Sequence, residues 1–321
     1  MKHVFVINPA AGKEDSVESL TALLSGYENC EVYATQGPCD ATEYIRRRCT
    51  ENPNERMRFY ACGGDGTLNE VANGVVGFEN ASMGCYPCGS GNDFVKYFGG
   101  KKVFRDIEAL LEAPEEYIDL MRVDGRYAIN ATHFGFDSSV ATVMKNVRRK
   151  KIIGGSNAYT TGVVVSLFKA MKNKCRVIAD GEDLTPNGEI LLCTVANGQY
   201  VGGSFRCAPR SLCNDGLLEV CVVRPVSLPT FIRLIKLYSE GLHLENPKFE
   251  KYISYKRAKT VEIEAPEGFI YSFDGELISS PKFTVEVAPA AIRFAVPENA
   301  VYLPGALHVS RREEKKEALE I

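Results

Sequence analysis

The stretch RFYACGGDGTLNEVANGVV, residues 58–76, decides the fold. It opens on a short apolar run at 58–62, passes through Gly63, Gly64 and Gly66, and continues as a helical pattern. The apolar face of that pattern, with the spacing i, i+3, i+4 and i+7, is Leu68, Val71, Ala72 and Val75. A strand that enters a helix through a glycine-rich turn is the repeating unit of a parallel α/β sheet.

The same alternation fills the first 125 residues. Apolar runs at 4–8 and 30–34 are followed by helical patterns at 17–24 and 42–49. We therefore predict an α/β domain over residues 1–125, with a parallel sheet and crossover helices.

Strand patterns dominate from residue 127 onward. They lie at 190–196, 217–223, 260–265, 270–273 and 283–287. Helical patterns interrupt them at 161–172 and 228–238. We predict a mainly β second domain, an antiparallel sandwich, over residues 126–294.

The three glycines at 63–66 indicate that this turn binds an anion. A glycine-rich turn at a helix N-terminus lets backbone N–H groups approach an anion, and the helix dipole favours negative charge there. A plain tight turn would explain one glycine, but neither three nor the carboxylate of Asp65 among them. A carboxylate beside a phosphate makes sense if a divalent cation lies between them, so Asp65 predicts Mg²⁺.

Two further turns of this kind follow predicted strands. They are NPAAGK at 8–13 and PCGSGNDF at 87–94, although the second could equally well do no more than cap a helix. Because the carboxyl ends of parallel strands meet at one crevice, the three turns together predict a nucleotide site. The P-loop, protein-kinase, dinucleotide and esterase motifs are absent from the sequence.

Composition narrows the class of protein. The net charge of −3, from 38 basic and 41 acidic residues, gives no reason to expect nucleic-acid binding. No apolar run reaches the length of a signal peptide or a transmembrane segment, so we expect a cytoplasmic protein. Its eleven cysteines are then read as reduced thiols.

One basic cluster stands out, and it consists of Lys145, Arg148, Arg149, Lys150 and Lys151. A solvated helix face is the ordinary explanation. Attraction to anionic lipid headgroups, with Ile152 and Ile153 beside the charges, is the functional one.

Taken in order along the chain, the motifs resemble those of the bacterial diacylglycerol kinase and lipid kinase family, which has sphingosine and ceramide kinases as relatives. They are NPAAGK at 8–13, GGDGTLNE at 63–70, GSGNDF at 89–94, GFD at 135–137, NDGLLEV at 214–220 and FDGE at 273–276. The resemblance implies an ATP- and Mg²⁺-dependent kinase of a lipid hydroxyl, with its active site in the cleft between the domains. It also implies that residues 295–321 complete the first domain.

The family resemblance implies functional roles for individual residues of this sequence. It implies ATP contacts from Asn8, Pro9, Ala10, Ala11, Gly12, Thr35, Gly64, Asp65, Gly66, Thr67, Leu68, Asn69, Glu70 and Ser90. Asp65 and Asp119 would belong to the catalytic Mg²⁺ network, and Glu276 would be the general base. A second, structural Mg²⁺ would be held by Leu212, Asp215 and Leu217. We expect Asn92 and Asp93 in the substrate and phosphate region.

Phosphoryl transfer independently requires charge neutralisation on the phosphates and a carboxylate that accepts the proton of the attacking hydroxyl. Asp65 and Glu276 suit these tasks, although Glu276 could also be a solvated carboxylate beside an Asp-Gly hairpin turn. If Asp274 and Glu276 share a strand, they project from the same face.

Three functions stay open at this point. They are a lipid kinase acting peripherally at a membrane surface, a soluble-metabolite kinase resembling NAD kinase, and a nucleotide-binding regulator without catalysis. The chain departs from the family pattern at Val95, Lys96 and Cys213. Nothing in the sequence decides the lipid acceptor or whether the protein is a homodimer.

Overall fold

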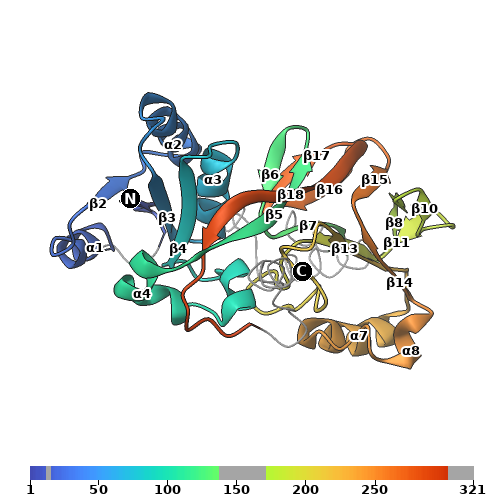
Figure 1. Cartoon of the computed structure of the whole chain (residues 1–321). Coiled ribbons are helices and arrows are strands. Elements are labelled where there is room, and N and C mark those ends of the chain that lie inside the picture. Colours follow the sequence, from blue (N-terminus) through green and yellow to red (C-terminus); the bar gives the residue numbers. More distant parts are fainter. Residues whose placement is uncertain (12–15, 137–170, 303–321) are drawn as a thin grey trace, which may run out of the picture.

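The computed structural model of the protein describes residues 1–11, 16–136 and 171–302. Its elements form two halves that lie side by side and are joined by long strands (Figure 1).

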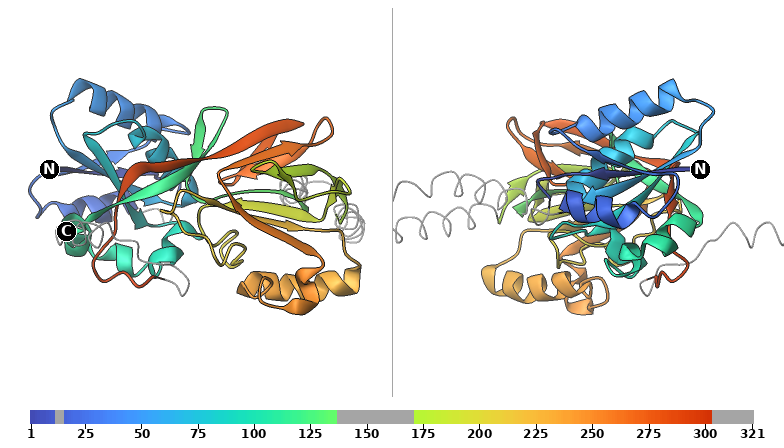
Figure 2. Two further views of the ribbon diagram at one scale, coloured as in Figure 1. Left: turned by 45° about the vertical axis from the view of Figure 1, so that its right-hand side comes forward. Right: turned by 90° about the vertical axis from the view of Figure 1, so that its left-hand side faces the viewer.

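The first half contains the predicted parallel sheet. Its strands follow the order β2-β1-β3-β4 with parallel pairing throughout. They are β1 (Lys2–Ile7), β2 (Cys30–Ala34), β3 (Met57–Gly63) and β4 (Ala81–Pro87). The helices are α1 (Ser16–Leu24), α2 (Asp40–Glu51), α3 (Asp65–Val75) and α4 (Ile107–Glu112). Figure 2 shows α2 on one side of the sheet and α1 and α4 on the other.

Helix α3 shows why this sequence takes this fold. The four apolar residues of its predicted face are each at most 2% exposed, and they pack into the core of the first half. At Gly74, on the same helix, a β-carbon would lie 2.8 Å from the Cβ of Ile45, so the missing side chain lets α2 approach closely.

One long strand, β18 (Lys282–Ala295), is common to both halves. It pairs antiparallel with β15 (Thr260–Glu264) and β5 (Glu115–Val123), and it runs parallel to β4 where Phe294 meets Met83. A register shift between Ala288 and Ile292 marks a bulge, and a bulge bends a strand. The expected domain boundaries fall at the turn from β5 into β6 (Arg126–Ala128) and at the end of β18, and they stay predictions.

The second half is the predicted antiparallel sandwich. A six-stranded sheet has the order β14-β13-β12-β7-β16-β17. Its strands are β7 (Ala131–Gly135), β12 (Leu192–Ala196), β13 (Leu218–Val223), β14 (Ile253–Ala258), β16 (Ile270–Phe273) and β17 (Glu276–Ser279). Its inner face packs against strands of the first sheet through a core that includes Phe134, Val195, Val220, Val261 and Val285.

The remaining elements are small or peripheral. Short strands of the second half are β8 (Asn173–Lys174), β9 (Arg176–Ala179), β10 (Glu182–Asp183) and β11 (Glu189–Ile190). Helices α7 (Leu228–Glu240) and α8 (Pro247–Glu250) cover the other face of the six-stranded sheet, where Leu234 and Tyr238 pack with Cys221 and Val223. None of the helices within the described ranges is long and apolar enough to cross a membrane.

The stretch after the second glycine turn is not an α-helix but two 3-10 turns, η1 (Phe94–Phe98) and η2 (Val103–Arg105). The first ends because Gly99 adopts a φ of 97°, a left-handed conformation that continues no helix. The helical pattern at 161–172 lies almost wholly outside the described residues.

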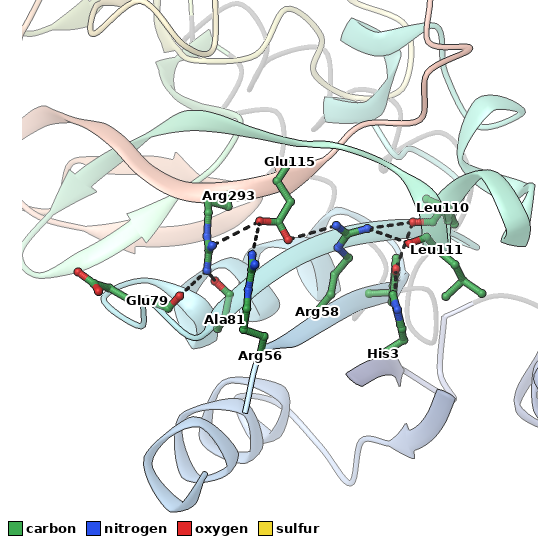
Figure 3. Close-up of polar contacts among 10 residues, drawn as sticks. His3, Arg56, Arg58, Glu79, Ala81, Leu110, Leu111, Glu115 and Arg293 are labelled. Carbon is green, nitrogen blue, oxygen red and sulfur yellow. Dashed lines mark hydrogen bonds and ion pairs between the residues drawn. The ribbon is translucent and has the colours of Figure 1, made fainter. Parts of the chain in front are cut away.

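A cluster of charged side chains joins the strands at the amino ends of the parallel sheet (Figure 3). The Arg58 side chain, 4% exposed, lies 3.1 Å from a Glu115 oxygen, and the other Glu115 oxygen faces Arg56 and Arg293, each at 3.4 Å. Nearby, burial and the Arg58 charge lower the pKa of His3 to about 4. The cluster therefore links β3, β5 and β18 at the end of the sheet opposite the glycine turns.

Candidate functional site

The glycine turns at 63–66 and 87–94 touch each other where β3 and β4 end. The carbonyl of Gly63 accepts hydrogen bonds from the backbone N–H groups of Cys88 and Gly89, both at 2.9 Å, and from the Asn92 side chain, also at 2.9 Å. A β-carbon on Gly89 would lie 2.4 Å from the Cα of Gly64. Glycine is required at position 89 because the two backbones are in contact.

The N-terminal turn joins them through Asn8. Its backbone N–H donates to the Cys62 carbonyl at 3.1 Å, and its side-chain amide donates to the Thr67 hydroxyl at 3.3 Å. Its amide oxygen accepts from the N–H of Ala10 at 3.0 Å. The structure thus brings the three predicted phosphate turns to one edge of the parallel sheet.

Asp65 holds the turns at 63–66 and 87–94 together. Its two oxygens accept the backbone N–H groups of Asn92, at 2.8 Å, and Asp93, at 2.6 Å. Burial, and then the charge of Asp93, raise the pKa of the Asp65 carboxyl. A carboxylate whose charge is disfavoured by a neighbouring negative charge is a suitable setting for a divalent cation.

Asp93 ties this edge to the second half of the protein. It is 6% exposed, and its oxygens accept the backbone N–H of Gly203 at 3.1 and 3.0 Å. The Lys96 ammonium group donates to Asp93 at 2.5 Å and to the Gly203 carbonyl at 2.6 Å, and it lies 5.2 Å from the centre of the Tyr200 ring. Lys96, which departs from the family pattern, thus fixes the 200–203 loop beside the turns.

The other predicted nucleotide residues surround the turns in different ways. Pro9, Ala10, Gly66 and Ser90 are exposed, whereas Thr67 and Leu68 are buried, and the Leu68 side chain belongs to the core. Thr35 follows the end of β2, where its N–H donates to Ile7. The Glu70 carbonyl accepts from the Thr42 hydroxyl. Gly12 lies outside the described residues, as do Asp137 and the basic cluster at 145–151.

Asn69 is the link from helix α3 to the hairpin that carries Glu276. Its side-chain amide donates to the Tyr127 carbonyl at 2.9 Å and to the Asp274 carboxylate at 2.8 Å. The same carboxylate accepts the backbone N–H groups of Ile129 at 2.7 Å, Asn130 at 3.1 Å and Ala131 at 2.9 Å. Asp274 therefore fixes the strand connection between the halves.

Asp274 and Glu276 do not share a strand, so the condition for projecting from one strand face is not met. Asp274 and Gly275, with φ of 45° and 91°, form the two-residue turn between β16 and β17, as Asp-Gly does in tight hairpins. Burial raises the pKa of Asp274 to about 6, against the opposing effect of its N–H donors. Glu276, the first residue of β17, is exposed and forms an ion pair with Arg126.

Asp119 lies on β5 and is 2% exposed. One of its oxygens accepts the N–H of Gly216 and the other that of Ala290, both at 2.7 Å, and burial raises its pKa. Within the described residues, its carboxylate accepts hydrogen bonds from these two groups alone. It therefore joins the 211–217 loop to the bulge in β18.

The predicted structural metal site lies in that loop. Asp215 accepts the N–H of Leu217 at 3.1 Å through one oxygen, and its other oxygen forms an ion pair with Arg257. Leu212 is buried. Sequence reasoning missed Arg257 because β14, where it lies, carries no motif.

This geometry places the Asp65 carboxylate at the N-terminus of α3, where backbone N–H groups can bind an anion, and it fastens the Glu276 hairpin to the same helix. Two family models match the chain. Residues 2–123 match the diacylglycerol kinase catalytic domain, and residues 130–296 match the YegS C-terminal NAD kinase beta sandwich-like domain.

Known proteins agree with these models. The chain is 28% identical over 285 residues to a diacylglycerol kinase of Bacillus subtilis, covering 86% of this chain and 90% of that protein. It is 31% identical over 254 residues to a probable lipid kinase YegS-like of Pseudomonas fluorescens, covering 78% and 80%. A crystal structure of a diacylglycerol kinase from Bacillus anthracis shares the fold, with a TM-score of 0.66, 22% identity and coverage of 95% and 98%. The chain is a kinase and belongs to the family of diacylglycerol kinases and YegS-like lipid kinases.

Proposed function

We propose that this protein transfers the γ-phosphoryl group of ATP, in the presence of Mg²⁺, to a hydroxyl of diacylglycerol or a related lipid, giving a phosphatidic acid-type product. One observation carries the proposal. Asp274 hydrogen-bonds Asn69, so the hairpin with Glu276 is fastened to the helix that begins at the glycine turn. A base and a phosphate cradle thus share one rigid support.

The three turns bind the nucleotide in this proposal. The N–H groups at the start of α3 and the backbone at 90–91 face the phosphates, where the helix dipole favours negative charge. Asp65 is the residue that would hold Mg²⁺, with Asp119 as the further carboxylate that the family resemblance adds, whereas Asp93 is already paired with Lys96. When bound, Mg²⁺ would neutralise charge on the β- and γ-phosphates.

Glu276 acts as the general base. The lipid hydroxyl gives its proton to the Glu276 carboxylate while its oxygen forms a bond to the γ-phosphorus. The bond from that phosphorus to the β–γ bridging oxygen breaks, and ADP leaves. Glu276 suits this step because it is exposed at the start of β17 and can meet an incoming lipid.

Each half binds one substrate. The α/β half, together with the C-terminal segment that returns to it, binds the nucleotide, and the β-rich half binds the lipid. The enzyme would act in the cytoplasm, peripherally at the membrane, where the basic cluster at 145–151 meets anionic headgroups.

A labelled-ATP screen tests the proposal. Purified protein is incubated with diacylglycerol, phosphatidylglycerol, polyprenol, sphingosine, ceramide or NAD, each with and without Mg²⁺. We expect label in a lipid, dependent on Mg²⁺. Label in NAD alone would identify a soluble-metabolite kinase, and ATP binding with no labelled acceptor would contradict the proposal.

A further inference from the structure

Two backbone N–H groups of the turn at 87–94, those of Ser90 and Gly91, donate no hydrogen bond within the described part of the chain. The N–H groups on either side of them are engaged, with the Gly63 carbonyl before them and with the Asp65 carboxylate after them. Ser90 is exposed, and a β-carbon on Gly91 would lie 2.6 Å from an Asp65 oxygen. Successive free N–H groups in a turn form a concave site for an anion, and this one lies beside the Asp65 carboxylate.

The Lys101 ammonium group holds the other side of the same peptide groups. It donates to the Gly89 carbonyl at 2.6 Å and to the Ser90 carbonyl at 2.9 Å. A trans peptide group is planar, so the N–H that shares a peptide group with each carbonyl points in the opposite direction. Those two N–H groups are the ones of Ser90 and Gly91. Lys101 therefore fixes the two peptide groups whose free donors point away from it.

The chain around Lys101 keeps it in this place. Phe98 and Phe104, both 0% exposed, precede and follow it, and their rings pack edge to face with centres 6.0 Å apart. Between them, Gly99 and Gly100 adopt φ of 97° and 89°, left-handed conformations that glycine takes readily. Lys101 forms no ion pair among the described residues, so its positive charge is available to favour an anion at the turn.

We propose that Lys101 is a positioning residue for the phosphates of ATP. It orients the two peptide groups between residues 89 and 91 so that the N–H groups of Ser90 and Gly91 donate to a phosphate oxygen. The inference rests on the proposed role of the glycine turns in ATP binding, and it adds a residue that lies outside their motifs. The family resemblance implies an ATP contact at Ser90 but gives Lys101 no part.

Calorimetric titration of the full-length protein tests the inference, with ATP plus Mg²⁺ and with adenosine as ligands. In Lys101→Met we expect the affinity for ATP to fall by about 10-fold, because the charge-assisted hydrogen bonds that orient the peptide groups are lost. Adenosine carries no phosphate and should bind as it does to the wild type. Lys101→Arg keeps the charge and the donors and should retain most of the ATP affinity.

The neighbouring Lys102 offers a matched control. Its side chain is exposed, and Lys102→Met removes the same charge without touching the turn, so ATP should bind it as it binds the wild type. Equal losses in Lys101→Met and Lys102→Met would overturn the inference, because the effect would then be one of net charge.

The outcomes also separate this inference from the proposed function. A wild type that binds ATP, with an unchanged affinity in Lys101→Met or with equal losses for ATP and adenosine, would overturn the inference alone. A wild type that binds no ATP would contradict the proposed function, and the inference with it. If Lys101→Met fails to fold, Lys101→Gln, which loses the charge and keeps a donor, takes its place, and an ATP affinity equal to that of the wild type would again overturn the inference.

Discussion

Asp65 combines two tasks that its sequence context reveals only in part. The glycines around it indicate a phosphate cradle, and a carboxylate there indicates a cation. The structure adds that its oxygens accept the N–H groups of Asn92 and Asp93 and so connect two turns. That second task was not predictable, because its donors lie 27 and 28 residues away along the chain.

Replacing Asp65 should therefore affect both activity and stability. In Asp65→Ala we expect nearly all phosphoryl transfer to disappear, because the carboxylate beside the phosphates is lost. Two part-buried N–H groups also lose their acceptor, at about 1 to 3 kcal/mol each if water does not replace it. Kinase assays and thermal unfolding measure the two effects, and activity within a few-fold of wild type would remove Asp65 from the site.

At the scale of elements, strands and helices followed their sequence patterns closely. β2 and β16 coincide with the predicted runs, and α3 buries the predicted face. The 3-10 helix η1 did not follow, because Gly99 takes a left-handed conformation and ends the segment after five residues. The role of Asp274 was also missed, since Asp-Gly predicts a turn and says nothing of donors 143 to 145 residues away.

Two variants of the hairpin that carries Glu276 distinguish the structural role of Asp274 from the catalytic role of Glu276. Asp274→Asn replaces one of the two acceptor oxygens with an amide NH₂, which opposes the N–H donors of residues 129–131. We expect both the Tm and the turnover rate to fall. Glu276→Gln, at an exposed position, should leave the Tm unchanged. An Asp274→Asn protein with wild-type Tm and turnover would show that the hairpin needs no such anchor.

At the scale of the whole molecule, β5 and β18 bind the halves into one body (Figure 1). Sequence patterns placed part of β18 correctly but could not show that one strand serves two halves, because its partners β4 and β5 lie far from β15 along the chain. The Glu115 cluster fixes that joint at one end. Burial raises the pKa of Glu115, but Ser82, Arg58 and Arg293 outweigh it, so the net pKa is lowered.

This lowered pKa predicts a pH-dependent loss of stability. A carboxyl whose folded pKa lies below its unfolded value stabilises the fold above the unfolded pKa, and the contribution disappears as pH falls through the folded pKa. Glu115→Gln should cost about 3 kcal/mol of unfolding free energy near neutral pH, because it leaves Arg58 buried without its counter-charge. Urea unfolding of both proteins should converge as the pH falls through the lowered pKa of Glu115, and a difference independent of pH would contradict this account.

Membrane association also belongs to the whole molecule. Neutralising Lys145, Arg148, Arg149, Lys150 and Lys151 should weaken activity on anionic vesicles far more than on detergent-solubilised lipid. High salt should have the same effect, since exposed charges are screened beyond about 8 to 10 Å at physiological ionic strength. Equal losses in vesicles and micelles would make the cluster an ordinary solvated face.

The turnover rate of Glu276→Gln tests the central claim most directly. The amide keeps the shape of the side chain but cannot accept a proton. With the lipid found in the screen, we predict a rate lower by about 10² to 10⁴-fold, and little change in ATP affinity measured separately by calorimetry. A variant that turned over at the wild-type rate while binding ATP much more weakly would contradict the account, because Glu276 would then be a nucleotide or metal ligand and not the base.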